Sequence, residues 1–171
     1  METQFDERNF RLLAAMPSAF RALAAEFEAA PALAAPRSPW GVKECVAHVL
    51  DVAEIAFVSR IGRIVTEENP FIRSIDPSAR LETEGYLLLP IESLLDELDD
   101  RRARDVAWLR SIPREAFART GTHDRAGTLS AADIANYWAF HDLTHVRQAA
   151  KALQDELIGR LGNTRLFIEE V

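Results

Sequence analysis

Apolar residues recur at every third or fourth position along four long stretches of the chain, which is the spacing of amphipathic helices. These stretches predict helices over residues 6–30, 41–66, 88–112 and 131–154. Glycine is scarce, with 7 residues, and runs of β-branched residues are short, so helices are favoured over strands. Because proline breaks the interior of a helix, the first helix is expected to kink or restart at Pro17.

The segments between the predicted helices carry proline and glycine turn signals. Asn69-Pro70 marks residues 67–84 as a loop, and Gly121 lies in a second predicted loop, residues 113–129. The two long loops leave room for crossover connections, so a simple up-down-up-down order of the helices is not implied. The sequence therefore predicts an all-α four-helix bundle, folded as a single domain over residues 1–171 with a short irregular or helical tail after the last helix.

Two of the four histidines, His141 and His145, lie four residues apart in the last predicted helix. Their Cα atoms are then offset by about 6 Å along the axis, on one face of the helix. The apolar residues that share this direction are Ile134, Trp138, Ala149 and Ala152. The histidines therefore lie on the side that faces the bundle interior, where buried imidazoles need partners: either a metal ion or ordinary hydrogen bonds.

His48 falls within the apolar arc of the second predicted helix. Together with His141 and His145 it can form a three-nitrogen metal site, which leaves one or more positions open to water or substrate, as in catalytic metal centres. A lone core histidine usually only hydrogen-bonds to a neighbour, and that alternative stays open for His48. His123, in the second loop, is interpreted as a surface residue.

Other metal motifs do not fit the sequence. A di-iron bundle needs Glu-x-x-His on each of two helices, whereas the chain offers only Asp142-x-x-His145. A metalloprotease needs His-Glu-x-x-His, and position 142 holds Asp instead of Glu. A structural zinc finger is excluded because Cys45 is the only cysteine.

Charge and composition exclude several partners. With 20 Lys and Arg against 27 Asp and Glu, the chain carries a formal charge of −7, whereas nucleic-acid binders usually present a basic face. The lone Cys45 permits no intrachain disulfide, which fits a reduced, cytoplasmic setting. The opening METQFDERNFRL lacks the apolar core of a signal peptide, and no stretch approaches the roughly 20 apolar residues that span a membrane. Neither a nucleic-acid partner nor a membrane is therefore expected.

Two segments resemble a known family. PWGVKE at 39–44, followed by HVLD at 48–51, resembles the "W-S-x-x-E-x-x-x-H-L-x-D" segment that opens the second helix of DinB/YfiT-like proteins. GTLS at 127–130, followed by HDLTHVRQ at 141–148, resembles the "H-D-x-x-H-x-x-Q" of their last core helix. The order, separation and chain length agree over about residues 8–155, and Gly41, which replaces the frequent Ser, is an acceptable N-cap.

The resemblance implies a bundle in up-down-down-up order and a divalent metal held by His48, His141 and His145. Members of this family are often dimers. Those with known activity include thiol-dependent transferases and isomerases that act with low-molecular-weight thiols, and some hydrolase-like members; many have no assigned activity. Phe140 and Leu143 point away from the histidine face, which predicts a homodimer that uses part of the last helix.

A divalent ion on three neutral imidazoles keeps its positive charge. It can lower the pKa of a bound water or thiol, which would then be the catalytic nucleophile, and it can polarise a carbonyl. The ligands do not choose between hydrolysis and thiol transfer of a small molecule, or between Zn, Ni, Fe and Mn, and imidazole also suits Cu. A non-catalytic, stress-related bundle that binds a metal or ligand, or an empty histidine site in a bundle kept for partner binding, remains an alternative.

Several residues lie close to the predicted site along the helices. Asp51 and Glu44 are within a turn of His48 and are candidates to hydrogen-bond its ring. Cys45, three residues before His48, is within reach as a thiolate, although a small buried apolar role fits it better.

The third and fourth predicted helices add further candidates. Tyr137 and Trp138 lie one turn before His141, so they either line a pocket or pack in the core. Arg102 and Asp105 lie at the edge of the apolar stripe of the third helix, where one of them could enter a cavity and bind an anionic substrate.

Overall fold

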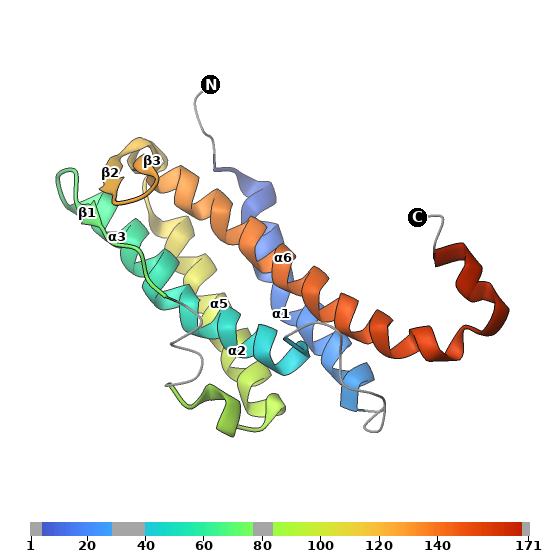
Figure 1. Ribbon diagram of the computed structural model, residues 1–171. Coiled ribbons are helices and arrows are strands. Elements are labelled where there is room, and N and C mark those ends of the chain that lie inside the picture. The colour runs from blue at the N-terminus through green and yellow to red at the C-terminus, as the bar shows by residue number, and fades with distance from the viewer. Residues whose placement is uncertain (1–4, 29–39, 77–83, 169–171) are drawn as a thin grey trace.

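Four long helical rods form a bundle with a small sheet at one end, as the computed structural model in Figure 1 shows. The structure describes residues 5–28, 40–76 and 84–168. The long helices are α1 (Glu7–Glu28), α2 (Val42–Val52), α3 (Ser59–Thr66), α5 (Ile91–Ser111) and α6 (Ala131–Leu157). A π-helical segment, η1 (Ala53–Val58), joins α2 and α3 into one continuous rod.

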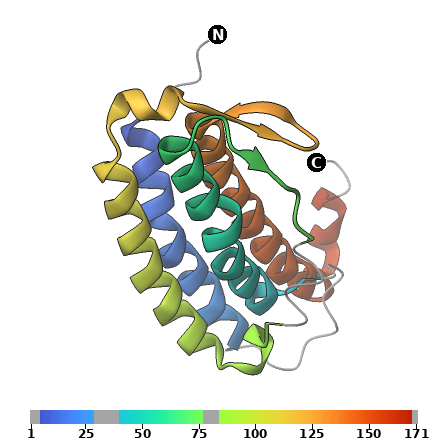
Figure 2. The same ribbon diagram turned by 90° about the vertical axis from the view of Figure 1, so that its left-hand side faces the viewer.

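The rods follow an up-down-down-up order. In Figures 1 and 2, α1 and α6 run in one direction, whereas α5 and the rod of α2, η1 and α3 run in the other. Around the bundle, α1 packs against α5 and α6, and α2 packs against the same two helices from the other side. Two neighbouring pairs are therefore parallel, α1 with α6 and α2 with α5, and the chain has to return along the length of the bundle between α3 and α5. The predicted all-α four-helix bundle and its helix order are confirmed.

Helix α1 contains Pro17 in its interior and does not restart there, contrary to one of the two expectations from the sequence. Pro17 is itself buried, between the fully buried Leu13 and Phe20. An interior proline costs a helix about 3 kcal/mol, and burying each large apolar side chain contributes about 1.5–3 kcal/mol. Packing on both sides of Pro17 therefore outweighs its cost. The predicted end of this helix at 29–30 lies outside the described residues.

The other helix limits differ from expectation by a few residues. Helix α5 starts at Ile91 after Pro90, because proline fits a helix start and the preceding residues 86–88 form the separate 3₁₀ turn η2 (Tyr86–Leu88). Helix α6 begins at the predicted N-cap, where Ser130 and Asp133 form a reciprocal capping box. Its tail continues as two 3₁₀ segments, η4 (Ile158–Arg160) and η5 (Gly162–Ile168).

The two segments expected to be loops contain a three-stranded sheet, which corrects the sequence-based prediction. Its strands are β1 (Phe71–Ile72), β2 (Thr120–His123) and β3 (Gly127–Ser130), preceded by the 3₁₀ segment η3 (Arg114–Ala118). Strand β2 pairs in parallel with β1 and antiparallel with β3, and Figure 2 shows the sheet at the end of the bundle beside α3 and α6. Strands of two to four residues are too short for the alternation that a sequence pattern detects.

Gly121 permits the close approach of β2 to the chain before β1. A Cβ atom at Gly121 would lie 2.9 Å from the carbonyl oxygen of Pro70 and 3.1 Å from Cγ1 of Ile64. The same Pro70 carbonyl accepts a hydrogen bond from the amide of Thr122 at 2.9 Å. Glycine is therefore needed because the two backbones meet here, not because a turn requires it.

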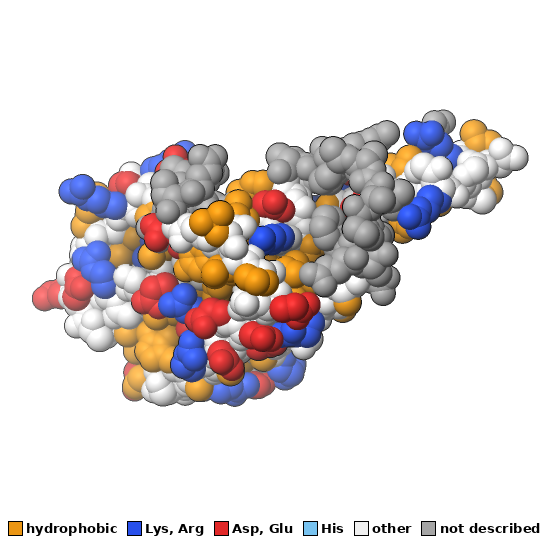
Figure 3. Space-filling view, turned by 90° about the horizontal axis from the view of Figure 1, so that it is seen from below, with side chains coloured by type: hydrophobic (Ala, Val, Ile, Leu, Met, Phe, Trp, Pro, Cys, Tyr) orange, Lys and Arg blue, Asp and Glu red, His pale blue; other side chains and the backbone are white. Residues whose placement is uncertain are grey.

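The buried apolar residues form two clusters along the bundle, one that includes Phe57, Ile61 and Trp138 and one that includes Val46, Leu50 and Leu95. Among the described residues, no helix is both long and apolar enough to cross a membrane. Figure 3, which views the molecule from below, shows acidic and basic side chains interspersed on that face instead of gathered into a basic patch among the described atoms.

Candidate metal centre

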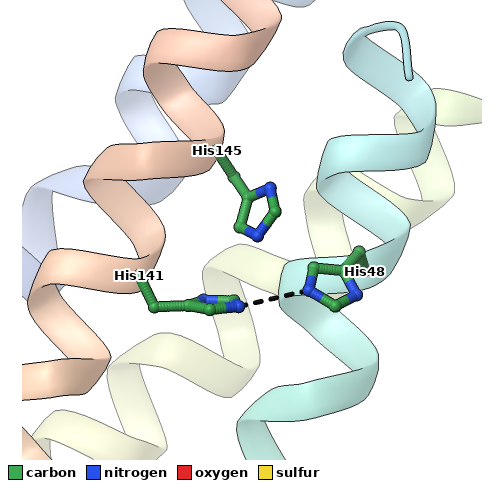
Figure 4. Close-up of side chains that lie close together, drawn as sticks. All are labelled: His48, His141 and His145. Atoms are coloured by element: carbon green, nitrogen blue, oxygen red, sulfur yellow. Dashed lines mark hydrogen bonds between the residues drawn. The ribbon is translucent and has the colours of Figure 1, made fainter. Parts of the chain in front are cut away.

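The three predicted histidines meet inside the bundle. His48 comes from α2 and His141 and His145 from α6, and Figure 4 shows their rings converging on one another. One ring nitrogen from each lies within 4.8 Å of the other two, and Nε2 of His48 is 3.1 Å from Nε2 of His141. His48 is buried, and the other two are partly buried. The four-residue spacing in α6 thus places both imidazoles opposite a single turn of α2.

Hydrogen bonds on the outer side of two rings decide which nitrogen faces the cluster. Nδ1 of His141 lies 3.3 Å from a carboxylate oxygen of Asp142, and Nδ1 of His145 lies 3.1 Å from Oε1 of Gln148. Both partners are acceptors here, so each Nδ1 carries the hydrogen and donates it. The Nε2 lone pairs of His141 and His145 are thereby left facing the common space, which is the arrangement of metal-ligating histidines.

Burial keeps two of the imidazoles neutral. Desolvation, followed by the nearby His145 and His141 rings, lowers the pKa of His48 to about 3. Desolvation and then His141 lower the pKa of His145 to about 4. Neutral imidazole is the form that ligates metals. His48 and His145 are therefore already in the ligating form at neutral pH.

Aromatic rings enclose the three histidines. The Trp40 ring is 4.8 Å from that of His48 and stacks on that of His145 at 5.7 Å between centroids. Phe57, from the π-helical segment η1, contacts the His141 ring edge-on at 5.3 Å. The π-turn is closed by the Ser59 amide bonding to the carbonyl of Glu54, and such turns recur at functional sites. Aromatic rings therefore pack directly against all three imidazoles.

A buried ion pair supports His141 from behind. Arg102 of α5 donates to one oxygen of Asp142, whose other oxygen accepts from His141, and both charged side chains are cut off from solvent. The Arg102 guanidinium also lies over the Trp138 ring, 4.9 Å from its centroid. Arg102 therefore does not enter a cavity to meet a substrate, a role that the sequence left open for either Arg102 or Asp105. The sequence contained one signal for this role, the Asp142 between the two α6 histidines.

Glu44 and Cys45, which lie near His48 on α2, take other roles. Glu44 accepts a hydrogen bond from the amide of Gly41 at 2.9 Å and closes a capping box at the start of α2. Cys45 is fully buried among apolar side chains, and burial raises the pKa of its thiol to about 12, so it is a packed, protonated thiol, not a nucleophile. Asp51 is buried on the same helix.

A cavity of about 500 Å³ opens from the histidine cluster toward the small sheet. His48 and His141 lie in its wall, and Tyr137 lines it, whereas Trp138 is buried in the core against Phe57. His123, on β2, also lines this cavity and is therefore not the plain surface residue that the sequence suggested. A volume of this size suits a small molecule.

Comparison with known proteins identifies the family and supports the fold. The model of the DinB superfamily matches residues 12–149, so the chain belongs to that superfamily. The structure of YfiT from Bacillus subtilis, described as "a probable metal-dependent hydrolase with an unusual four-helix bundle topology", superposes with a TM-score of 0.73. The alignment covers 91% of this chain and 87% of that one at 22% identity, so the likeness establishes the fold.

Two curated relatives are similar in sequence. A protein of Oceanobacillus iheyensis named "Putative metal-dependent hydrolase OB0782" is 29% identical over 107 residues. One of Geobacillus kaustophilus named "Putative metal-dependent hydrolase GK0616" is 33% identical over 112 residues. The matches cover 63% and 65% of this chain, which spans 61% and 62% of the two relatives.

Proposed function

We propose that this protein is a metal-dependent hydrolase of small molecules whose divalent ion is held by His48, His141 and His145. The observation that carries the proposal is the position of this cluster, because two of its three histidines form the wall of the 500 Å³ cavity. A ligand in the cavity would therefore reach the metal from the side that the protein leaves open. The names of the two curated relatives support the same class of reaction.

The chain's own residues have distinct tasks in this proposal. The three imidazoles bind the ion, which supplies Lewis-acid chemistry that activates a nucleophile and polarises the scissile bond of the substrate. Asp142 and Gln148 hold the rings of His141 and His145 through their Nδ1 hydrogens. Trp40 excludes water from the opposite side of the cluster.

Thiol transfer is the second reaction that the same centre would support, with a low-molecular-weight thiol as the nucleophile. The thiol would have to come from outside, because Cys45 is buried and protonated. Hydrolysis takes precedence here because the two relatives carry that name. A non-catalytic ligand-binding bundle is the outcome if no turnover is found.

The test is turnover by metal-loaded protein on a panel of small esters, amides and electrophiles, each with and without added thiol. Hydrolysis without thiol, lost in His145→Ala, supports the proposal. Turnover only with thiol replaces hydrolysis by thiol transfer, and no turnover with any metal overturns both. Thr144→Ala is the matched control on the same helix, because its hydroxyl bonds only to the backbone carbonyl of Phe140 among the described contacts.

We further propose that the chain forms a homodimer through the outer face of α6. Phe140 and Leu143 are 65% and 41% exposed on this face, which is unusual for two neighbouring large apolar side chains. Light scattering at tens of micromolar should give twice the chain mass of 19.2 kDa, and Phe140→Glu should return it to the monomer. A monomer in the unsubstituted protein would overturn this proposal.

A further inference from the structure

The cavity beside the histidine cluster has two chemically different ends. Near the cluster its walls are largely apolar, formed by Val52, Ala56, Phe57, Ile134 and Tyr137. At the other end, where the small sheet covers the bundle, the wall includes Arg60, Arg125, His123 and Ser74. A ligand that fills the cavity would therefore meet apolar walls along its body and hydrogen-bond donors at one end.

The cations at the sheet end come from separate elements. Arg60 belongs to α3, and Arg125 belongs to the turn between β2 and β3. Arg60 is partly buried, and Nη2 donates to the carbonyl of Arg73 at 2.9 Å, which fixes the guanidinium at the wall. A guanidinium has five N–H donors, so further donors remain for a ligand. Arg125 is exposed at the rim.

Two carboxylates near this end are engaged elsewhere. Asp133 lines the cavity, but its carboxylate accepts hydrogen bonds from the amide and hydroxyl of Ser130 in the capping box of α6. Asp124 accepts hydrogen bonds from the amide and the hydroxyl of Ser74, and it is not among the residues that line the cavity. Asp124 also raises the pKa of Arg60, whereas burial, the larger effect, lowers it. Among the described contacts, the Arg60 guanidinium donates only to the Arg73 carbonyl.

We propose that the cavity selects substrates that carry an anionic group, a carboxylate or a phosphate, joined by an apolar spacer to the part that reacts at the histidine cluster. Arg60 and Arg125 are the specificity-determining residues, and they bind the anion at the sheet end. This proposal rests on the proposed function for the reacting end only, because the binding of the anion is a property of the cavity itself. The sheet, which the sequence did not predict, supplies one of the two cations.

Paired ligands of equal length test the proposal in the metal-loaded protein. The first ligand is the monohydroxamate of suberic acid, which carries a metal-binding hydroxamate and a free carboxylate, and the second is its neutral carboxamide counterpart. Isothermal titration calorimetry should give at least about tenfold tighter binding of the acid, as expected for charge-assisted hydrogen bonds. Arg60→Gln combined with Arg125→Gln should remove this preference and leave the affinity for the carboxamide unchanged. Arg114→Gln, an exposed arginine of η3 outside the cavity, is the control and should keep the preference.

A second arm separates this proposal from the metal. In metal-free protein, octanoate and octanamide are titrated by NMR, and the resonances of His123 and Tyr137 report on the two parts of the cavity. Stronger binding of octanoate that disappears in the double arginine variant supports anion selection even where no metal binds. Equal binding of acid and amide in both arms, or an acid preference that survives the double variant, overturns the proposal. A phosphate-ended ligand that outranks the carboxylate assigns the anion as phosphate within the same proposal.

Discussion

The guanidinium of Arg102 and the carboxylate of Asp142 form an ion pair in which both side chains are closed to solvent, with exposed fractions of 1% and 0%. The pair joins α5 to α6 directly behind His141, because the second oxygen of Asp142 accepts from that ring. One carboxylate therefore neutralises a buried cation and orients a candidate metal ligand. We therefore expect stability and metal binding to be coupled through it, and substitutions can separate the two.

Asp142→Leu should be strongly destabilising. It leaves the Arg102 charge buried without its partner, which costs about 3–5 kcal/mol. Urea or guanidinium unfolding of the metal-free protein measures this loss. Arg102→Met combined with Asp142→Leu removes both charges and should recover most of the stability.

The double variant should nevertheless bind metal about 10–100-fold more weakly, because Nδ1 of His141 has lost its acceptor. The comparison of unfolding with metal titration on the same two variants therefore separates the two roles of Asp142. A double variant that keeps full metal affinity would show that Asp142 does not position His141.

Gly121→Ala should destabilise the protein by about 1–3 kcal/mol, because the new methyl group would lie 2.9 Å from the Pro70 carbonyl oxygen and force the two backbones apart. The matched control is Gly159→Ala. A Cβ there meets no atom within 4 Å and its φ is not in the left-handed region, so a change within about 0.5 kcal/mol is expected. Equal denaturation midpoints for the two variants would contradict the close approach.

Asp105 should make the protein less stable as pH rises. Burial raises the pKa of its carboxyl to about 6, from an ordinary value near 3.8, and one of its oxygens has no hydrogen-bond partner among the described residues. The folded state then holds a proton that the unfolded state releases. The contribution of Asp105 to the free energy of unfolding therefore falls between about pH 4 and pH 6 and stays low above pH 6.

Asp105→Asn removes this contribution. Between pH 4 and pH 7, the free energy of unfolding of the variant should change by on the order of 1 kcal/mol in favour of the folded state, relative to the unsubstituted protein. The change is no larger because partial solvent access screens the full effect of the pKa shift. Unfolding of both proteins across this range gives the difference directly, because contributions from other groups cancel. A constant difference at all pH values would show that the pKa of Asp105 is not raised.

Periodicity predicted the helices well because each long helix buries a continuous apolar stripe. Leu94, Leu95, Leu98 and Leu109 of α5 are all buried, and so are Ile134, Trp138, Ala149 and Ala152 of α6. The placement of His141 and His145 side by side was predictable for the same reason, because two residues four positions apart lie on the same face of a helix. These features depend on neighbours along one helix.

What the sequence did not predict depends on contacts between distant segments. The pairing of Phe71 with Thr122 across the end of the bundle has no local pattern, and it places His123 in the cavity wall. The sequence places Arg102 at the edge of the apolar stripe of its helix, but it does not reveal the ion pair, because the partner Asp142 is 40 positions away. Arg60 and Arg125 were missed because no spacing relates them.

The central claim is that His48, His141 and His145 hold one divalent ion. Metal analysis of the protein after loading with Zn, Ni, Fe or Mn and removal of free ions tests it most directly. The account predicts one ion per chain, lost in His48→Ala, His141→Ala and His145→Ala, each with an unchanged helical circular dichroism spectrum, and retained in His123→Ala, which alters the cavity wall but not the cluster. No stoichiometric metal in the unsubstituted protein, or unchanged metal content in the three cluster variants, would contradict it.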